Sequence, residues 1–352
     1  MQSLVVLISI GGAVALLLFA LRLVQDGVTE AFGLRLKLAL GHGMRTAPRA
    51  FLSGLIATLG LQSSTATALM TAGFVERDMI AQGRAQVVLL GANLGTALTA
   101  LIVTAGLEAL SPALLLIGYA LQRQTSPALA GSGRALIGIG LVLLSLILLT
   151  AVTAPLRDSE ALKAFLELLD DAPPVAFAVA AGLAVLFSSS LAVVMLVLAI
   201  GVGGGLDPAV AVVLVLGANF GGAIPPVLAT LSSAPAARRV TVGNLTVRGL
   251  GCLVALPFVG IIGPELAELE LRGGGLPVDA HLAFNLVLAA LIWPVAGLLA
   301  RALPLLVPDP PVETGEGPRW LDEAALDHPD VALAGASREA LVLGDTVEEI
   351  AR

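Results

Sequence analysis

The sequence predicts an all-α polytopic membrane protein, and three observations support this prediction. Of its 352 residues, 57% are hydrophobic and 13% are charged, and the mean hydropathy is +0.97. An ordinary soluble domain is about 45 to 50% apolar and about 25% charged, which excludes a soluble globular protein. Long apolar stretches recur between short polar breaks, each near the roughly 20 residues that a helix needs to cross a bilayer. The ten-residue alternating segments of a barrel do not occur.

Several functional classes are excluded by what the sequence lacks. The single cysteine, Cys252, lies in an apolar stretch, so a disulfide framework, a thiol metal site and a redox pair are excluded. The three histidines do not cluster, and the apolar stretches supply no combination of nucleophile, base and orienting group. We therefore expect no enzyme, no cofactor, no metal other than a transported cation, and no nucleic-acid partner.

The chain divides by charge near residue 308. Residues 308–352 carry 11 acidic and 3 basic residues, whereas residues 1–307 are almost neutral. The first part is expected to form the transmembrane domain, and the second an acidic cytosolic tail. No lysine or arginine precedes Arg22, so residues 4–21 lack the basic segment of a cleaved signal peptide and are expected to be the first span.

Lysine and arginine in short loops mark the cytoplasmic side of a membrane protein. Basic residues gather in residues 22–49, 123–134 and 238–239, and acidic residues gather in residues 158–171 and 265–279. The basic segments are expected in the cytoplasm and the acidic ones outside. In the inner (cytoplasmic) membrane of a cell, this places the N-terminus outside and the C-terminus in the cytoplasm.

The first half contains an apolar stretch that must turn back within the membrane. Stretches near residues 51–75, 84–107 and 112–121 separate two cytoplasmic segments, so three full crossings would end on the wrong side. Polar residues 62–65 interrupt the first stretch after 11 residues, which rise only about 16 Å. This stretch is predicted to be a re-entrant hairpin.

The second half repeats this feature. Residues 175–200 are broken at residues 187–190 after 12 residues, and residues 209–231 follow. The change of side from the acidic segment to the basic segment allows one crossing only. A second hairpin, inserted from the opposite face, is therefore predicted.

Paired motifs relate the two halves. Gln62-Ser63-Ser64-Thr65 precedes Gly91-Ala92-Asn93-Leu94-Gly95-Thr96, and Phe187-Ser188-Ser189-Ser190 precedes Gly217-Ala218-Asn219-Phe220-Gly221-Gly222, at offsets of 125 and 126 residues. The halves are predicted to be inverted-topology repeats, each with a re-entrant helical hairpin and a broken transmembrane helix. Secondary transporters built this way hold substrate at the midplane between the repeats. Repeat 1 is expected at about 1–122, repeat 2 at about 133–263, and a final helix at about 280–303.

The hairpin tips carry groups that suit an anion and a cation together. Hydroxyls and backbone N–H groups where the outgoing half-helices begin, at Ala66 and Leu191, form a positive dipole end that suits an oxyanion. Carbonyls freed at the end of the incoming half-helix, with the Gln62 amide oxygen, suit a hard monovalent cation. Small polar residues also pack membrane helices closely, but two matched runs favour a binding site. Asn93 and Asn219 fit either a site or a hydrogen bond between helices.

Charged residues within the spans are few. No aspartate or glutamate falls in the middle of a predicted span, so neutral oxygen ligands favour Na⁺ over a proton. His281 follows Asp279 at a helix start and is expected at the membrane interface. Arg248 is either buried and directed at an anion or extended to the cytoplasmic interface, and we favour the second.

These motifs resemble those of a known family. Gln62 to Thr67 and Gly91 to Thr96 resemble the QSSS and GANIGT signatures of the type II sodium-dependent phosphate cotransporters, including bacterial members. The resemblance covers nearly the whole chain, and Ala280 to Asn285 resembles the AHxxFN segment of these proteins. Residues 320–349 resemble the linker into a PhoU-like cytosolic domain, here truncated.

The resemblance implies a function and a set of site residues. It implies sodium-coupled symport of inorganic phosphate, with residues 1–307 as the transport domain. It assigns phosphate to Ser63, Ser64, Thr65, Ser188, Ser189 and Ser190. It assigns Na⁺, the coupling ion, to Gln62, Thr67, Asn93, Thr96 and Asn219, and it makes Arg248 a candidate anion contact.

Four departures from the family pattern bear on coupling. Phe187 stands where a second glutamine is usual, Leu191-Ala192-Val193 replaces a small-Thr-Thr run, Gly222 replaces a threonine, and Arg248 replaces an asparagine. Two alternatives therefore stay open. One is a carrier or exporter of phosphate or another oxyanion with altered Na⁺ coupling. The other is a non-transporting membrane regulator whose tail contacts a cytosolic partner.

Overall fold

The computed structural model describes residues 2–43, 46–153, 160–201, 206–269, 275–309 and 320–351. Every regular element in these residues is a helix. The chain divides into two compact units, Met1–Pro308 and Asp309–Arg352, and each is considered by itself.

The first unit is a bundle of apolar helices. In chain order it is built from α1 (Gln2–Gly43), α2 (Ala47–Leu61), α3 (Ser64–Glu76), α4 (Gln82–Val103), α5 (Ser111–Gln122), α6 (Pro127–Thr153), α7 (Glu160–Asp171), α8 (Pro173–Leu186), α9 (Ser190–Gly201), α10 (Pro208–Gly221), α11 (Ile224–Ala229), α12 (Pro235–Ala255), α13 (Val259–Leu269), α14 (Leu276–Ile292) and α15 (Ala296–Leu306). Short 3₁₀ helices, Leu256–Phe258 and Trp293–Val295, join α12 to α13 and α14 to α15.

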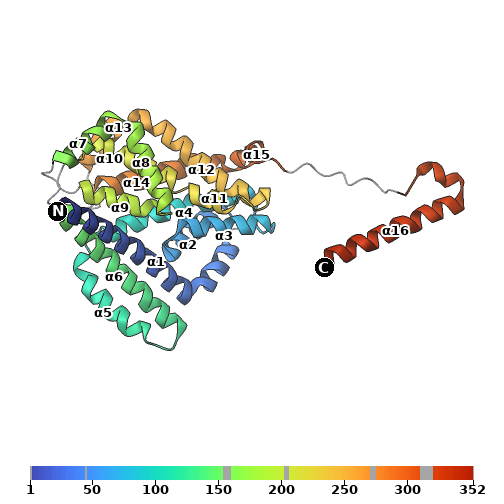
Figure 1. The fold of residues 1–352 in the computed structure, drawn as a ribbon, viewed down its shortest axis with the longest axis horizontal. Coiled ribbons are helices and arrows are strands. Elements are labelled where there is room, and N and C mark those ends of the chain that lie inside the picture. Colours follow the sequence, from blue (N-terminus) through green and yellow to red (C-terminus); the bar gives the residue numbers. More distant parts are fainter. Residues whose placement is uncertain are drawn as a thin grey trace. The chain divides into compact units, whose positions relative to one another are not determined.

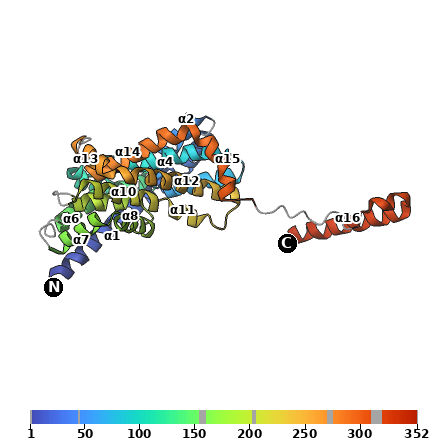
Figure 2. The same ribbon diagram turned by 90° about the horizontal axis from the view of Figure 1, so that it is seen from above.

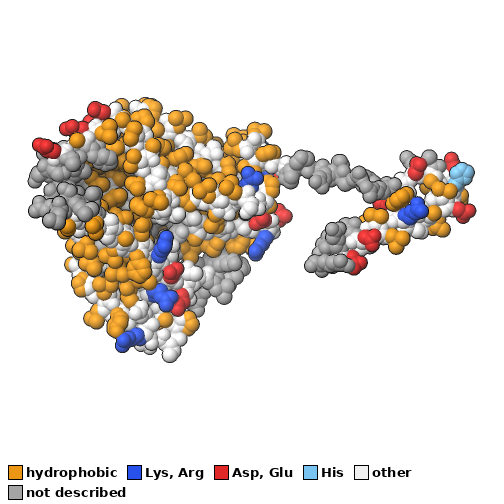
Figure 3. All heavy atoms as spheres, in the orientation of Figure 1, with side chains coloured by type: hydrophobic (Ala, Val, Ile, Leu, Met, Phe, Trp, Pro, Cys, Tyr) orange, Lys and Arg blue, Asp and Glu red, His pale blue; other side chains and the backbone are white. Residues whose placement is uncertain are grey.

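Six segments of this unit are long and apolar enough to cross a membrane. They are Ile8–Gly33, Gln82–Val103, Pro127–Thr153, Pro208–Ala229, Pro235–Leu269 and Leu276–Leu306. Hydrophobic side chains cover much of the visible face of the unit (Figure 3), as suits a surface that meets lipid rather than water. These features confirm an all-α polytopic membrane protein.

Helix α1 is longer than the sequence predicted. Residues 22–49 were predicted to be a cytoplasmic loop after a span at 4–21, but α1 continues without a break to Gly43. The apolar span within it is Ile8–Gly33, so Arg22 lies inside the span. The physical reason is the absence of proline before Pro48, which leaves nothing in this leucine-rich segment to end the helix.

Two pairs of short helices, α2 with α3 and α8 with α9, match each other in form. The four helices have 15, 13, 14 and 12 residues, and none reaches the roughly 20 residues of a full crossing. The first pair breaks at Gln62–Ser63 and the second at Phe187–Ser189. The polar breaks found in the sequence are thus real breaks in the helices.

Glycines of the repeated motifs allow one long helix to lie close against each pair. A Cβ on Gly91 of α4 would collide with the Phe51 carbonyl oxygen of α2, and a Cβ on Gly217 of α10 would collide with the Phe177 carbonyl oxygen of α8. Gly91 and Gly217 are 126 residues apart in the sequence, and so are Phe51 and Phe177. A second pair of contacts follows the same offset: Gly95 lies against Leu55, and Gly221 lies against Ala181. Close helix approach therefore accounts for the glycines of both motifs.

The remaining helices enclose these elements. Helices α1 and α6 lie side by side in both ribbon views (Figures 1 and 2), and α5 packs along α6. Residues 112–121 were predicted to cross the membrane, but α5 has 12 residues, which rise about 18 Å, and it is not among the six long segments. Helix α10 contacts α8, α9, α12, α13 and α14, and its apolar residues lie in the main core.

The second unit holds a single long helix, α16 (Pro329–Ala351), after a 3₁₀ turn at Glu323–Asp327. The Trp320 backbone N–H donates a hydrogen bond of 2.8 Å to the Glu339 carboxylate, and the Arg338 guanidinium lies 4.8 Å from the centre of the Trp320 ring. These contacts fold the segment before the 3₁₀ turn back onto α16.

Candidate functional site

The two helix breaks have the same local geometry. Gln62 and Ser188 adopt left-handed backbone conformations, each with φ of 51°. In each case the next residue caps the outgoing helix: Ser63 Oγ accepts from the Ala66 N–H at 3.1 Å, and Ser189 Oγ accepts from the Ala192 N–H at 3.2 Å. A side-chain oxygen at this position satisfies an N–H that has no partner within the helix.

These features correct the alignment of the two tips. The predicted offset of 125 residues paired Gln62 with Phe187, whereas the left-handed residues and the caps are each 126 residues apart. Ser188 is therefore the equivalent of Gln62. Phe187 ends α8 and packs against the apolar core. Three consecutive serines fit either offset, so the sequence alone could not fix the register.

Both tips line one small polar pocket of about 30 Å³. Its lining consists of Gln25, Gln62, Ser63, Ser64, Thr65, Thr96, Ser188, Ser189, Ser190, Leu191 and Gly222. All six residues assigned to phosphate are among them, and so are two of those assigned to Na⁺, Gln62 and Thr96.

One polar residue of the pocket was not predicted. Gln25 reaches the pocket from α1, and its Nε2 donates to the Gln62 carbonyl oxygen at 3.2 Å. This glutamine was expected in a cytoplasmic loop, because the first span was predicted to end at residue 21. In the sequence Gln25 directly precedes Asp26 and lies three positions after Arg22, so nothing distinguished it from the polar residues of a loop.

The absence of a threonine at position 222 has a steric cause. Gly222 is the equivalent of Thr96 at the offset of 126 residues. A Cβ on Gly222 would lie 2.9 Å from the Ser190 Cβ, so a larger side chain would displace the serine at the tip of α9. The pocket consequently has a threonine hydroxyl on its first-half side and none on its second-half side.

Three residues assigned to Na⁺ do not line the pocket. Thr67 is fully buried and accepts a hydrogen bond of 2.9 Å from Thr58 Oγ1. Asn93 and Asn219 lie deeper in the bundle, where each accepts a hydrogen bond from Arg248 through its side-chain oxygen. These three residues therefore lie outside the pocket that Gln62 and Thr96 line.

Arg248 and His281 occupy a buried polar cluster rather than the membrane interface. Arg248 is 2% exposed and His281 is 0% exposed. His281 Nδ1 lies 2.9 Å from Asn219 Nδ2, and Asn285 Nδ2 donates to the Asn219 oxygen at 3.0 Å. Both interfacial expectations were wrong, because the partners of these side chains come from helices that are distant in the sequence.

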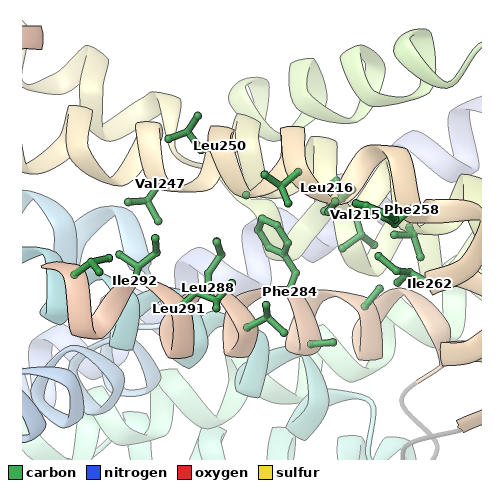
Figure 4. Close-up of a pocket in the computed structure, with 18 of the residues that line it drawn as sticks. Val215, Leu216, Val247, Leu250, Phe258, Ile262, Phe284, Leu288, Leu291 and Ile292 are labelled. Carbon is green, nitrogen blue, oxygen red and sulfur yellow. The ribbon is translucent and has the colours of Figure 1, made fainter. Parts of the chain in front are cut away.

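A large apolar cavity between α12 and α14 has the wrong chemistry for an anion. It has a volume of about 840 Å³ and apolar walls, with α12 on one side and α14 on the other (Figure 4). Val247 and Leu250 line it from α12, and Phe284, Leu288 and Leu291 line it from α14. None of these side chains can replace the hydration of phosphate. The small pocket between the tips is therefore the candidate site.

Comparisons with known proteins agree with the motifs. The family model described as Na⁺/Pi-cotransporter matches residues 16–151. The chain is 36% identical over 340 residues to the "Putative inorganic phosphate export protein YjbB" of Salmonella typhimurium, covering 96% of this chain and 63% of the relative. The protein of the same name from Escherichia coli K12 is 35% identical over the same shares. No solved structure matches the chain.

A more distant relative also matches most of the chain. The "Uncharacterized protein YqeW" of Bacillus subtilis is 25% identical over 262 residues, which cover 74% of this chain and 85% of the relative. The chain spans less than two thirds of the length of the phosphate export relatives that it matches. The segment at residues 16–151, which holds the break at Gln62 and the first glycine motif, is thus similar to the Na⁺/Pi-cotransporter family.

Proposed function

We propose that the protein carries inorganic phosphate across the inner membrane, coupled to Na⁺. The observation that carries this proposal is the pocket to which both serine-bearing tips contribute. The relatives' printed names, which describe putative export of inorganic phosphate, support phosphate as the substrate. The proposed action is carriage of a solute and includes no chemical conversion.

The phosphate would be held by the tips of α3 and α9. Ser63, Ser64 and Thr65 contribute from one tip, and Ser188, Ser189 and Ser190 from the other. Hydroxyl groups and the N-terminal ends of two helices supply hydrogen-bond donors and partial positive charge, which oxyanions require.

Na⁺ would be held on the first-half side of the pocket. Gln62 Nε2 donates to the Leu59 carbonyl at 2.7 Å and lies 3.4 Å from the Thr99 hydroxyl, so its amide oxygen is the atom suited to a cation. The Thr96 hydroxyl lines the same side. The second half has Gly222 in place of this hydroxyl, so we propose that it contributes less to Na⁺ binding.

The proposed topology follows from the helix pairs. The pairs α2–α3 and α8–α9 would be re-entrant hairpins of two inverted repeats, inserted from opposite faces. The N-terminus would lie outside and the C-terminus in the cytoplasm. Residues 1–307 would form the transport domain. Residues 308–352 would be a cytosolic tail that begins a PhoU-like segment and contacts a cytosolic partner.

Movement in the export direction is the second candidate, because the relatives are named for putative phosphate export. Uptake and export use the same site and differ in the gradients that drive them. The two are separated by the response of flux to an imposed Na⁺ gradient. In either case arsenate, a phosphate analogue, should compete and sulfate should not.

The test is ³²P-phosphate flux in proteoliposomes with an imposed Na⁺ gradient. Gln62→Ala removes the proposed cation ligand and should abolish Na⁺-dependent flux. The matched control is Gln124→Ala, which changes an exposed glutamine in the turn between α5 and α6. Unchanged Na⁺-dependent flux in Gln62→Ala would refute the proposed site.

A further inference from the structure

Arg248 joins the equivalent asparagines of the two halves. Its Nη1 donates to Asn93 Oδ1 of α4 at 3.2 Å, and its Nη2 donates to Asn219 Oδ1 of α10 at 2.8 Å. The two asparagines are 126 residues apart, the offset that relates the tips. One planar guanidinium therefore bridges the two halves through a matched pair of oxygens. We call Asn93, Asn219 and Arg248 the arginine clamp.

The arginine clamp lies about one helix turn from the pocket between the tips. Asn93 precedes the pocket residue Thr96 by three positions on α4, and Asn219 precedes the pocket residue Gly222 by three positions at the end of α10. Three residues of helix rise about 4.5 Å. The same two helices thus present both the clamp oxygens and two walls of the pocket.

The charge of Arg248 has no carboxylate partner among the described residues. Both of its hydrogen-bond partners are neutral amides. Its Nε is buried and has no hydrogen-bond partner among the residues that the structure describes. Guanidinium stays protonated in proteins, and a buried charge is costly unless another charge offsets it. Charged residues inside membrane proteins accordingly mark pathways for ions. An anion in the neighbouring pocket would supply the missing charge.

We propose that the guanidinium of Arg248 is a fixed cation that takes the place of a bound Na⁺. Its guanidinium occupies the asparagine oxygens that would otherwise suit Na⁺, and its charge stabilises phosphate between the tips. Na⁺ then binds on the Gln62 side alone, and phosphate binds measurably without Na⁺. This inference rests on the proposed phosphate site and specifies how part of its charge is balanced.

The experiment measures the affinity of the purified full-length protein in nanodiscs for ³²P-phosphate, with choline or with Na⁺ as the only cation. Arg248→Gln removes the charge, and we expect affinity in choline to fall by about tenfold or more. Na⁺ should restore part of this loss, because the asparagine oxygens become free to bind it. Arg248→Lys keeps the charge and should retain most of the affinity in choline.

Asn93→Asp separates an electrostatic role of Arg248 from a structural one. The new carboxylate would pair with Arg248 and strengthen the link between helices, while it cancels the positive charge. Asn244, which accepts a hydrogen bond of 2.8 Å from Asn93, can turn its amide to donate instead. We expect Asn93→Asp to lose affinity in choline as Arg248→Gln does, with an unchanged or higher melting temperature.

The outcomes distinguish this inference from the proposed function. Arg123→Gln, at an exposed arginine beside Tyr119, is the control and should behave as the unmodified protein. If the unmodified protein binds phosphate while Arg248→Gln and Asn93→Asp match it in choline, the inference is wrong and the phosphate site stands. If Arg248→Lys loses as much affinity as Arg248→Gln, the guanidinium acts through its shape and the inference is again wrong. No phosphate binding by the unmodified protein in either cation overturns both.

Discussion

At the scale of residues, the left-handed conformations of Gln62 and Ser188 decide where the helices break. A non-glycine residue in this region costs about 1 to 2 kcal/mol, so its presence at equivalent positions indicates a constraint shared by the two tips. The serine that follows caps the next helix, and its neighbours face the pocket. The strained residue and the cap together turn a continuous apolar stretch into two half-helices.

The pocket residues show which parts of a site a sequence can reveal. The six hydroxyl residues were identified because they lie together in two polar runs within apolar stretches. Gln25 was missed because it belongs to no polar motif and meets Gln62 only through folding. The burial of Arg248 was the less favoured alternative for the same reason, since its partners lie 155 and 29 residues away. Contacts between distant residues leave no local pattern.

The motif glycines give a prediction about stability. Gly91→Ala should destabilise the protein by about 1 to 3 kcal/mol, because the new methyl group would collide with the Phe51 carbonyl oxygen. Thermal unfolding in detergent, followed by tryptophan fluorescence, measures the change, since Trp293 stacks on Phe51 at 4.9 Å. Gly73→Ala is the control, as nothing lies within 4 Å of its added Cβ. Equal melting temperatures for the two variants would contradict this role of Gly91.

At the scale of elements, helix existence followed from composition, whereas helix ends and the number of crossings did not. The breaks at both tips were predicted because polar residues interrupt short apolar arms. The length of α1 was not, because a basic segment resembles a loop although it can remain helical. Six long segments alone would return the C-terminus to the side of the N-terminus. The proposed topology therefore requires α5 to cross as well, despite its 12 residues.

Cysteine labelling tests this topology. With Cys252 replaced by alanine, Arg77→Cys after α3 and Asp171→Cys before α8 each place one exposed thiol at the mouth of a hairpin. A membrane-impermeant maleimide should label Asp171→Cys in cells with a permeable outer layer and an intact inner membrane. It should label Arg77→Cys only after the inner membrane is opened.

The protein without an introduced cysteine is the control and should remain unlabelled. Labelling of both positions from the same side would show that the hairpins do not insert from opposite faces. It would also show that α5 does not cross.

In the fold as a whole, the candidate site is formed only because two halves distant in sequence meet. The repeated breaks, caps, glycine contacts and asparagines all follow one offset of 126 residues. The sequence predicted this pairing of halves from motif spacing and the sides of the loops. It did not predict the arginine clamp, which breaks the match between the halves by placing a single charge between equivalent residues.

In the proposed function one phosphate contacts both tips, and a double-mutant cycle can test this contact. Ser64 and Ser190 are the best pair, because the hydroxyls of their neighbours Ser63 and Ser189 already cap helices. Phosphate affinity would be measured for Ser64→Ala, Ser190→Ala, the double variant and the unmodified protein. Two serines that bind the same ion should give a coupling energy of about 0.5 to 3 kcal/mol. Losses that add within about 0.3 kcal/mol, or no loss at all, would contradict a shared phosphate site.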